Sequence, residues 1–478
     1  MRLILQVAGT FVFIGLLLRL HSYLDEDYYE MFSWSNPDAL PEANLRIIVF
    51  GTQDMVGSAV DSKGGRDTWP QLLCHELNCS SLLSFVPDDQ SSPGVTSNAI
   101  YGAELEALHE ATEGANLVEH PASDFNFVAE QYPVPSSTAD LSQQLDKFLS
   151  LPPSEKVPRE TLWIFTFGTW DVWKLAALSP DIGKQILDDL INHMFNHIEE
   201  LYLASLDPES IAYSDFWTNV SLKEVKKLTA PNAVEKVDNR KLEGFRLLIP
   251  QLFDITLTPG WSTRPEPTIP HTKGEHLRNA AILTNHWNSQ IASALQTWTD
   301  LGNAKPLSLG EDEAGTKNPE MEEVMGATKE EVAVDAITAR SSVANGRGRA
   351  KGGEDIIVAP YPLRLAYQTR QGSGIRDAVT EQHMQRAGES DSQGRGTMSP
   401  NATMQFRDVW TPCVLEGSES EVVEEGGEGL CDSPSDHLFY DGFTVGQKAM
   451  KQLVRRTARQ VFKKLIFREE PKKGWFVS

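Results

Sequence analysis

The stretch RIIVFGTQDMVGSA, residues 46–59, decides how this chain is expected to fold. Ile47 to Phe50 form an apolar run that ends at Gly51, and such a run predicts a buried strand followed by a tight turn. A turn at the end of a buried strand is where a hydrolase can present its nucleophile. Thr52 and Gln53 stand at that point, so the sequence predicts the geometry of a nucleophile turn without a serine in it.

The overall composition is that of a large, acidic globular protein. The chain has 478 residues, of which 40% are hydrophobic, enough for one large core or two smaller ones. Its 67 acidic residues outnumber its 43 basic ones, and the formal net charge is −24. Such a charge repels nucleic-acid phosphates and anionic lipid alike, so we expect no nucleic-acid partner.

Apolar runs alternate with helical patterns, which predicts an α/β fold: a three-layer sandwich with a mainly parallel sheet flanked by helices. ETLWIFTFG at 160–168 reads as a further buried strand, and FRLLIPQLFDITLTPGW at 245–261 reads as another strand that runs into a loop. Two long helices are predicted, one over 181–206 and one that begins after the capping box formed by Thr272 and Glu275. The apolar stripe of the first helix is Ile186, Leu190, Met194, Ile198 and Leu201.

His193 and His197 stand four residues apart on that first helix and could share a metal ion. The intervening segment MFN lacks the glutamate of a zincin motif, and the sequence offers no evident third ligand. We therefore interpret both histidines as structural, and predict no metal and no cofactor.

The N-terminal residues MRLILQVAGTFVFIGLLLRLHS predict a membrane address. The sixteen uncharged residues 3–18 would span about 24 Å as a helix, a little less than the ~30 Å bilayer core. No small-residue cleavage site follows, which favours a signal anchor over a cleaved signal peptide. We expect 1–24 to be this segment, 25–44 to be juxtamembrane, and the remainder to be luminal or extracellular, with secretion after cleavage as the alternative.

Glycosylation acceptors and cysteines agree with a secretory compartment. The acceptors are Asn78, Asn219 and Asn401. The four cysteines form two close pairs, Cys74 with Cys79 and Cys413 with Cys431, although the sequence alone allows three connectivities. Neither pair has the spacing of a zinc site, so we expect disulfides.

Two segments are expected to interrupt the domain. Residues 306–354 contain no aromatic residue and few large apolar ones, which predicts a flexible insertion between the parts 45–305 and 355–478. Residues 415–430 form an acidic loop between Cys413 and Cys431.

Four segments resemble, in order, sequence blocks of the SGNH, or GDSL, hydrolases. IIVFGTQD resembles the first block, where strand one ends in Phe-Gly-Asp-Ser, and WIFTFGTWDVW at 163–173 resembles the third, Phe-Gly-x-Asn-Asp. TSNAIYGAEL at 96–105 resembles the second block, and CDSPSDHLFYDGFTVGQKA at 431–449 the fifth. The resemblance implies an SGNH-hydrolase or flavodoxin-like version of the sandwich, and the anchored, acidic layout is similar to a fungal branch of this superfamily.

The resemblance also assigns positions at the expected oxyanion hole and nucleophile. Gln53 falls on the nucleophile and Thr52 on the neighbouring aspartate. Gly102 takes the place of the glycine whose amide completes the oxyanion hole, and Trp170 replaces the oxyanion asparagine, with its indole N–H as the remaining donor. An amide side chain such as that of Gln53 cannot form an acyl-enzyme.

In the last block the resemblance keeps the aspartate and loses the base. Asp441 stands at the catalytic aspartate, and Thr444 stands at the histidine position. His437 is either a substitute base or a structural histidine. Each loss of a triad member costs about 10⁴–10⁶ in rate, because the members act as a unit.

Three functions remain open at this point. The first is a membrane-anchored pseudo-hydrolase that binds a glycan or ester ligand or scaffolds a secretory-pathway enzyme. The tryptophans available to stack on sugars are Trp163, Trp170, Trp173, Trp217 and Trp261. The second is an active carbohydrate esterase or O-acyltransferase that uses Thr52, His437 and Asp441 in a rearranged site. The third is a structural secretory-pathway protein without a ligand. The sequence identifies no protein partner.

Overall fold

The computed structural model describes fifteen stretches of the chain. They are residues 45–53, 67–87, 94–114, 124–135, 138–154, 156–158, 160–214, 216, 244–303, 363–369, 396–397, 405–406, 408–414, 431 and 433–466. The chain divides into two units, Met1–Ala43 and Asn44–Ser478, and all described residues belong to the second. The predicted anchor, the insertion 306–354 and the acidic loop 415–430 therefore lie outside the described residues.

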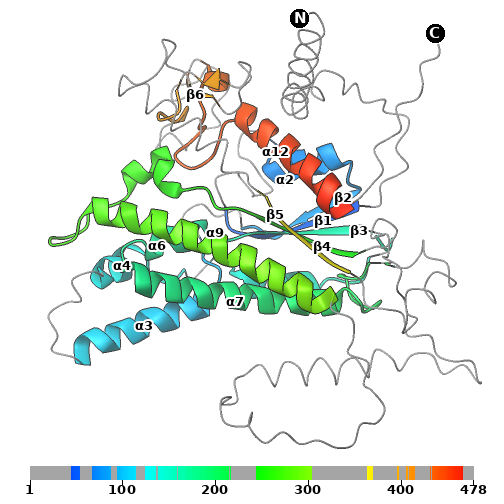
Figure 1. The fold of residues 1–478 in the computed structure, drawn as a ribbon, viewed down its shortest axis with the longest axis horizontal. Helices are drawn as coiled ribbons and strands as arrows, with labels where there is room; N and C mark the ends of the chain where they lie inside the picture. The colour runs from blue at the N-terminus through cyan, green and yellow to red at the C-terminus, as the bar shows by residue number, and fades with distance from the viewer. Residues whose placement is uncertain are drawn as a thin grey trace, which may run out of the picture. The chain divides into compact units, whose positions relative to one another are not determined.

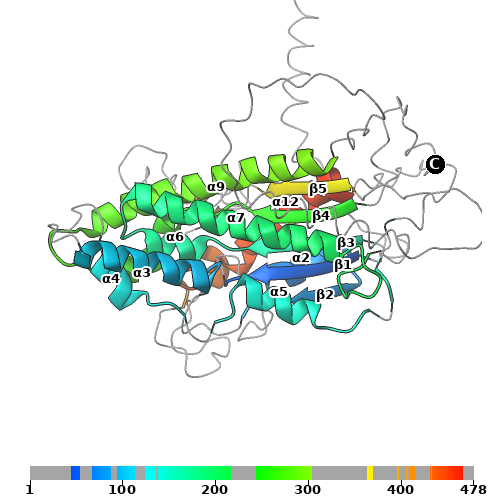
Figure 2. The same ribbon diagram turned by 90° about the horizontal axis from the view of Figure 1, so that it is seen from below.

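The described core is a five-stranded sheet in which every pairing is parallel. Its strands are β1 (Leu45–Gly51), β2 (Ser81–Ser84), β3 (Glu160–Thr166), β4 (Gly244–Pro250) and β5 (Leu363–Thr369). Their order across the sheet is β2-β1-β3-β4-β5 (Figure 2). The prediction of an α/β fold with a mainly parallel sheet is confirmed. A separate antiparallel pair joins β6 (Gly396–Thr397) and β7 (Gln405–Phe406).

Helices cover both faces of the sheet (Figure 1). On one face lie α3 (Asn98–Gly114), α4 (Phe125–Gln131), α5 (Leu141–Leu149), α6 (Thr169–Leu175), α7 (Pro180–Ala204) and α9 (Lys273–Asn303). On the other lie α2 (Trp69–Leu77) and α12 (Gln447–Val461), which the π-helical turn η6 (Phe462–Ile466) follows. Three short 3-10 turns complete the described elements: η2 (Ile255–Leu257), η3 (Pro259–Thr263) and η5 (Pro434–Asp436).

The molecule has two hydrophobic cores, one on each face of the sheet, and successive side chains of a strand point alternately into them. Ile48 and Phe50 of β1 point to the α7 and α9 side, whereas Ile47 and Val49 point to the α12 side. Because both faces are covered, the strand is apolar almost throughout, as the sequence run predicts.

The two long helices form as their patterns predict. All five residues of the predicted stripe on α7 are buried. At the start of α9, the Thr272 amide donates to Glu275 Oε2 over 2.9 Å, and the Glu275 amide donates to Thr272 Oγ1 over 3.2 Å, so the predicted capping box is present. The described residues contain no helix long and apolar enough to cross a membrane.

Gly51, the last residue of β1, lies so close to β3 that no side chain fits. A Cβ built on Gly51 would lie 1.9 Å from Thr166 Oγ1 and 2.7 Å from the Thr166 carbonyl oxygen. The backbone oxygen cannot move without breaking the sheet, so the turn at this strand end requires glycine.

We expect Gly51→Ala to lower the free energy of unfolding by about 1–3 kcal/mol or more, because the added methyl group overpacks a backbone contact. Gly274→Ala is the matched control, since the nearest atom to its new Cβ is 3.9 Å away and alanine favours the helix. Urea unfolding of the full-length chain measures both changes. Equal effects at the two positions would contradict this account of the turn.

Candidate functional site

The turn after β1 is held by one side chain from α5. Gln144, which is 1% exposed, accepts the Gly51 amide hydrogen at Oε1 over 2.9 Å and donates from Nε2 to the Gly51 carbonyl over 2.9 Å. Its Nε2 also donates to the Ala139 carbonyl over 2.9 Å. Both backbone groups of Gly51 are therefore satisfied in the interior by a single amide.

Thr52 is buried, and its hydroxyl is engaged with the backbone. It is 1% exposed, its amide donates to the Thr166 carbonyl over 3.0 Å, and its Oγ1 donates to the same oxygen over 3.3 Å. A hydroxyl becomes a nucleophile when a general base lies within hydrogen-bond reach. Among the described residues, no histidine is hydrogen-bonded to Thr52.

Gln53 and Trp170 join the ends of β1 and β3. The Trp170 indole N–H donates to the Gln53 carbonyl oxygen, and Gln53 Nε2 donates to the Pro87 carbonyl over 3.2 Å. The indole N–H that could have served an oxyanion is thus bonded to the main chain. The two positions that the resemblance assigns to the nucleophile and to the oxyanion asparagine do meet, but through a structural hydrogen bond.

The ring of Trp170 belongs to an aromatic cluster made of Trp170, Trp173, Trp261 and Phe443. Trp170 and Phe443 have ring centroids 5.0 Å apart, and Trp173 lies 5.2 Å from Trp261 and 5.5 Å from Phe443. Phe443 lies directly against Gly260, where a Cβ would come within 2.4 Å of its ring, and the Gly260 amide donates to the Gly442 carbonyl over 2.7 Å. The segments after β1, β3 and β4 and the loop before α12 therefore meet here.

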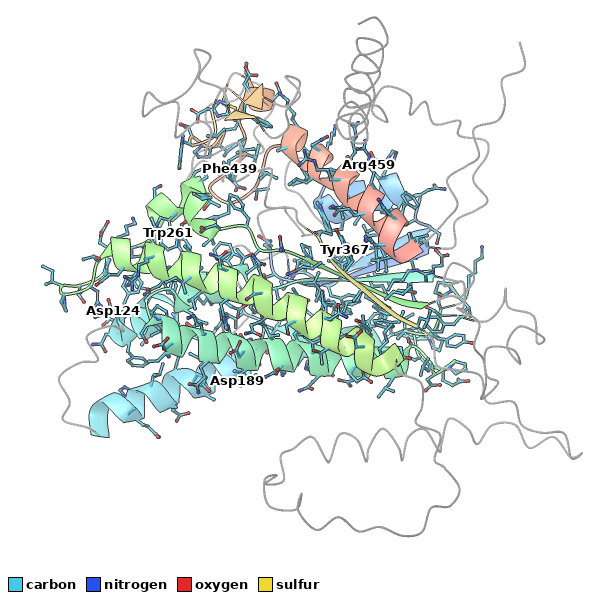
Figure 3. The ribbon with its side chains drawn as sticks, in the orientation of Figure 1. Asp124, Asp189, Trp261, Tyr367, Phe439 and Arg459 are labelled. Carbon is cyan, nitrogen blue, oxygen red and sulfur yellow. A yellow bond between two sulfur atoms is a disulfide. The ribbon has the colours of Figure 1, made fainter. Side chains whose placement is uncertain are left out.

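The tryptophans of this cluster are packed against each other and are nearly inaccessible to a ligand. Trp170 is 8% exposed, Trp173 7% and Trp261 6%. Figure 3 labels Trp261 in the segment between β4 and α9. Trp163 is 1% exposed and stacks on Phe245 in the core. Trp217 lies outside the described residues. The rings that the sequence offered for stacking on sugars are, where described, core residues.

Asp441 and Thr444 form a local turn. Asp441 Oδ1 accepts from the amides of Phe443 over 2.8 Å and Thr444 over 2.5 Å, as an Asx turn does. The Thr444 carbonyl accepts from the Tyr440 amide over 2.7 Å. The carboxylate of the fifth block thus shapes the loop that carries Phe443.

His437 is directed elsewhere. Its Nδ1 is 2.9 Å from the Thr411 carbonyl oxygen, and its backbone pairs with Asp408. The structure gives it no hydrogen bond to Thr52 or to Asp441, so the rearranged triad is not assembled in the described residues. The disulfide Cys413–Cys431 lies beside this loop, and the Cys413 amide donates to the Phe439 carbonyl over 3.2 Å.

Gly94, which sequence reasoning missed, packs against Thr52. A Cβ on Gly94 would lie 3.4 Å from Thr52 Cγ2. Gly102 instead is the fifth residue of α3, where the helical pattern directs the amide to the carbonyl four residues earlier. The signal that could have found Gly94 is the Pro-Gly pair shortly before Ser97, whose carbonyl accepts the Tyr101 amide at the start of α3.

Asp171 holds the segment beside Gly94 in place. It is 0% exposed and accepts from the Thr96 amide over 3.0 Å and from Thr96 Oγ1 over 2.7 Å. Burial raises the pKa of Asp171, against the lowering effect of the Thr96 hydrogen bonds and of Lys174. Burial in turn lowers the pKa of Lys174 to about 8. The block Phe-Gly-x-Asn-Asp carries an aspartate at this position, which was the available signal.

Arg264 packs against the aromatic cluster and is 1% exposed. Its Cζ lies 4.9 Å from the centroid of Trp173, 5.2 Å from that of Trp261 and 5.1 Å from that of Tyr132. Nη1 donates to the Trp173 carbonyl over 2.5 Å, and Nε donates to His276 Nδ1 over 3.3 Å. Burial lowers the pKa of Arg264 to about 10. Cation–π contacts therefore stabilise this cation in place of a carboxylate.

The remaining predicted sites are also placed. The structure contains the disulfides Cys74–Cys79 and Cys413–Cys431. Asn78 is exposed at the C-terminal end of α2, while Asn219 and Asn401 lie outside the described residues. Within the described stretches, no group of three or more His, Cys, Asp or Glu residues is arranged to hold a metal ion.

No protein-family model matches this chain, and no curated protein matches it significantly. The resemblance to the SGNH hydrolases therefore stays a prediction that rests on the quoted segments.

His276 predicts how stability depends on pH. Burial, followed by the charge of Arg264, lowers its pKa from 6.5 to about 3. The unfolded chain therefore binds the extra proton first, and stability contributed by neutral His276 is complete above pH 6.5 and is lost as the pH falls toward 3.

We expect His276→Gln, which keeps an acceptor for Arg264 Nε, to reduce the pH dependence of the unfolding free energy between pH 6.5 and 4 by up to about 1.4 kcal/mol per pH unit. Urea unfolding at a series of pH values measures this. Parallel curves for the variant and the wild type would contradict this, because they would mean that His276 binds protons equally in the folded and the unfolded chain.

Proposed function

We propose that this chain is a pseudo-hydrolase of the SGNH/GDSL type, anchored in the secretory pathway by residues 1–24, and that it acts by binding a partner rather than by acyl transfer. Of the two kinds of partner compatible with such a protein, the geometry favours a secretory-pathway enzyme over a glycan or ester ligand at the strand ends. The reason is that the described tryptophans there are buried against one another.

The strand order supports this assignment. Parallel strands in the order β2-β1-β3-β4-β5 with helices on both faces have the flavodoxin-like, doubly wound arrangement that the resemblance implies. In such sheets function is located outside the carboxyl ends of the strands. The first, third and fifth blocks all reach that edge, at Gln53, Trp170 and Phe443.

One observation carries the proposal: the Trp170 indole donates to the Gln53 carbonyl. In a working site, an asparagine at the Trp170 position would donate to the oxyanion formed at a serine on the Gln53 position. Here the donor is bonded to the main chain, and the acceptor belongs to a residue with no nucleophilic group. The hydroxyl next to it, that of Thr52, is buried and donates to the Thr166 carbonyl.

The esterase alternative needs His437 to reach Thr52, and the hydrogen bond from His437 to the Thr411 carbonyl places its ring in another contact. The third alternative, a structural protein without a ligand, shares the inert site and differs only in having no partner.

Fluorophosphonate labelling of the full-length chain tests the proposal. We expect no covalent labelling and no turnover of an activated acetate ester, because among the described residues no histidine is hydrogen-bonded to Thr52 and the Trp170 indole N–H is bonded to the main chain. Thr52→Ser is the matched control. If the hydroxyl of residue 52 is nucleophilic, the serine variant should label at least as well as the wild type, whereas a buried structural hydroxyl stays unlabelled in both. Labelling of the wild type that disappears in Thr52→Ala would contradict the pseudo-hydrolase assignment.

Glycosylation at Asn78 tests the compartment. We expect expression in a eukaryotic host to yield a product that shifts on removal of N-glycans. Asn78→Gly should lose one glycan and still fold, because residue 78 has φ 51° and glycine accepts this conformation. Ser80→Thr keeps the acceptor motif and should keep the glycan. Full-length protein that carries no N-glycan would exclude a luminal or extracellular domain.

A further inference from the structure

Two histidines of α7 converge on one oxygen atom of α5, on the face of the sheet that these two helices cover. Ser142 Oγ, near the start of α5, is 3.2 Å from His193 Nε2 and 3.0 Å from His197 Nε2. The two imidazole rings have centroids 4.5 Å apart. Figure 3 labels Asp189 on α7, and His193 lies one helical turn beyond it. Residues four apart lie on the same face of a helix, so both Nε2 atoms are directed at the same small space.

The other nitrogen of His197 has a carboxylate partner. His197 Nδ1 is 3.1 Å from Glu200 Oε2, so Nδ1 carries the hydrogen and the lone pair of Nε2 faces Ser142. A carboxylate on the far nitrogen is the arrangement that orients a metal-bound histidine and raises its basicity. This pairing gives a reason for the orientation of His197 that is independent of its spacing from His193.

We propose that His193 and His197 bind one divalent transition-metal ion, Zn²⁺ or Cu²⁺, through their Nε2 atoms. Imidazole nitrogen is the ligand that these ions share, at about 2.0–2.1 Å for Zn²⁺. The protein supplies two nitrogen ligands, the Ser142 hydroxyl lies at the open side, and water completes the coordination. The proposed site has only two protein nitrogen ligands. It therefore does not conflict with the finding that the described residues contain no group of three or more His, Cys, Asp or Glu residues arranged to hold a metal ion. It replaces the interpretation of both histidines as structural.

Charge and exposure favour this ion. The two Nε2 atoms already lie within 3.0–3.2 Å of one oxygen atom, so little rearrangement is needed for both to bind one ion. The side chains of His197 and Glu200 are 19% and 50% exposed, so an ion from solution can reach them. The net charge of −24 attracts cations to the surface as a whole.

Titration calorimetry on the full-length chain, purified without a polyhistidine tag, tests the site with ZnCl₂ and CuCl₂ as the probes. We expect one saturable site per chain. His193→Gln and His197→Gln should each weaken binding at least tenfold, and Glu200→Gln should weaken it by about 10–100-fold because the orienting carboxylate is lost. His286→Gln, which removes a histidine paired with Asp188 over 2.7 Å, is the matched control and should leave the affinity unchanged.

Ser142→Ala distinguishes a metal site at His193 and His197 from a site in which His197 activates the Ser142 hydroxyl. A metal site retains its two nitrogen ligands, so the affinity should stay within a few-fold of the wild type, and the paramagnetic resonance spectrum of bound Cu²⁺ should still show two nitrogens. Urea unfolding of each metal-free variant checks that it folds. The proposal is overturned if the folded wild type shows no saturable binding, if His197→Gln binds as the wild type does, or if Ser142→Ala abolishes binding.

Discussion

The close approach of β1 and β3 at Gly51 is the constraint on which the strand-end region depends. A side chain on Gly51 would collide with the Thr166 carbonyl oxygen, and the backbone groups of Gly51 are both bonded to Gln144. Together these contacts fix where Thr52 and Gln53 leave the sheet. The amide of Thr52 then donates to Thr166, and the carbonyl of Gln53 faces Trp170. Glycine and a buried amide thus hold this strand-end turn, in which the Thr52 hydroxyl donates to the Thr166 carbonyl.

The aromatic cluster extends this constraint to the rest of the carboxyl edge. Trp170 connects the ends of β1 and β3, Phe443 lies against Gly260 after β4, and the Arg264 guanidinium packs against the rings of Trp173 and Trp261. Under the proposed pseudo-hydrolase assignment, groups that pack stand where acyl transfer would need catalytic groups. Replacement at several positions of one site is what a change from catalysis to binding predicts, since triad members lose their value together.

Patterns local in sequence could be predicted, and contacts between distant segments could not. The strands β1, β3 and β4 and the helices α7 and α9 follow from apolar runs and a 3.6-residue period. The edge strands β2 and β5 are only partly buried, so they lack an apolar run and were not singled out. Gly94, Asp171 and Arg264 act through partners far along the chain. The convergence of His193 and His197 on Ser142 was equally hidden, because Ser142 belongs to another helix.

The unfolding free energy of Trp170→Asn tests the central claim most directly, because this change introduces the amide that the resemblance to the SGNH hydrolases implies at this position. If Trp170 is a packing residue, the variant loses about 3–5 kcal/mol in urea unfolding of the full-length chain, as expected for removal of a buried aromatic side chain. A large loss of stability would distinguish Trp170 from a residue kept for function, since such residues are often not optimal for stability. A variant as stable as the wild type, with ester turnover that the wild type lacks, would contradict the account and indicate a site in which only the oxyanion donor was missing.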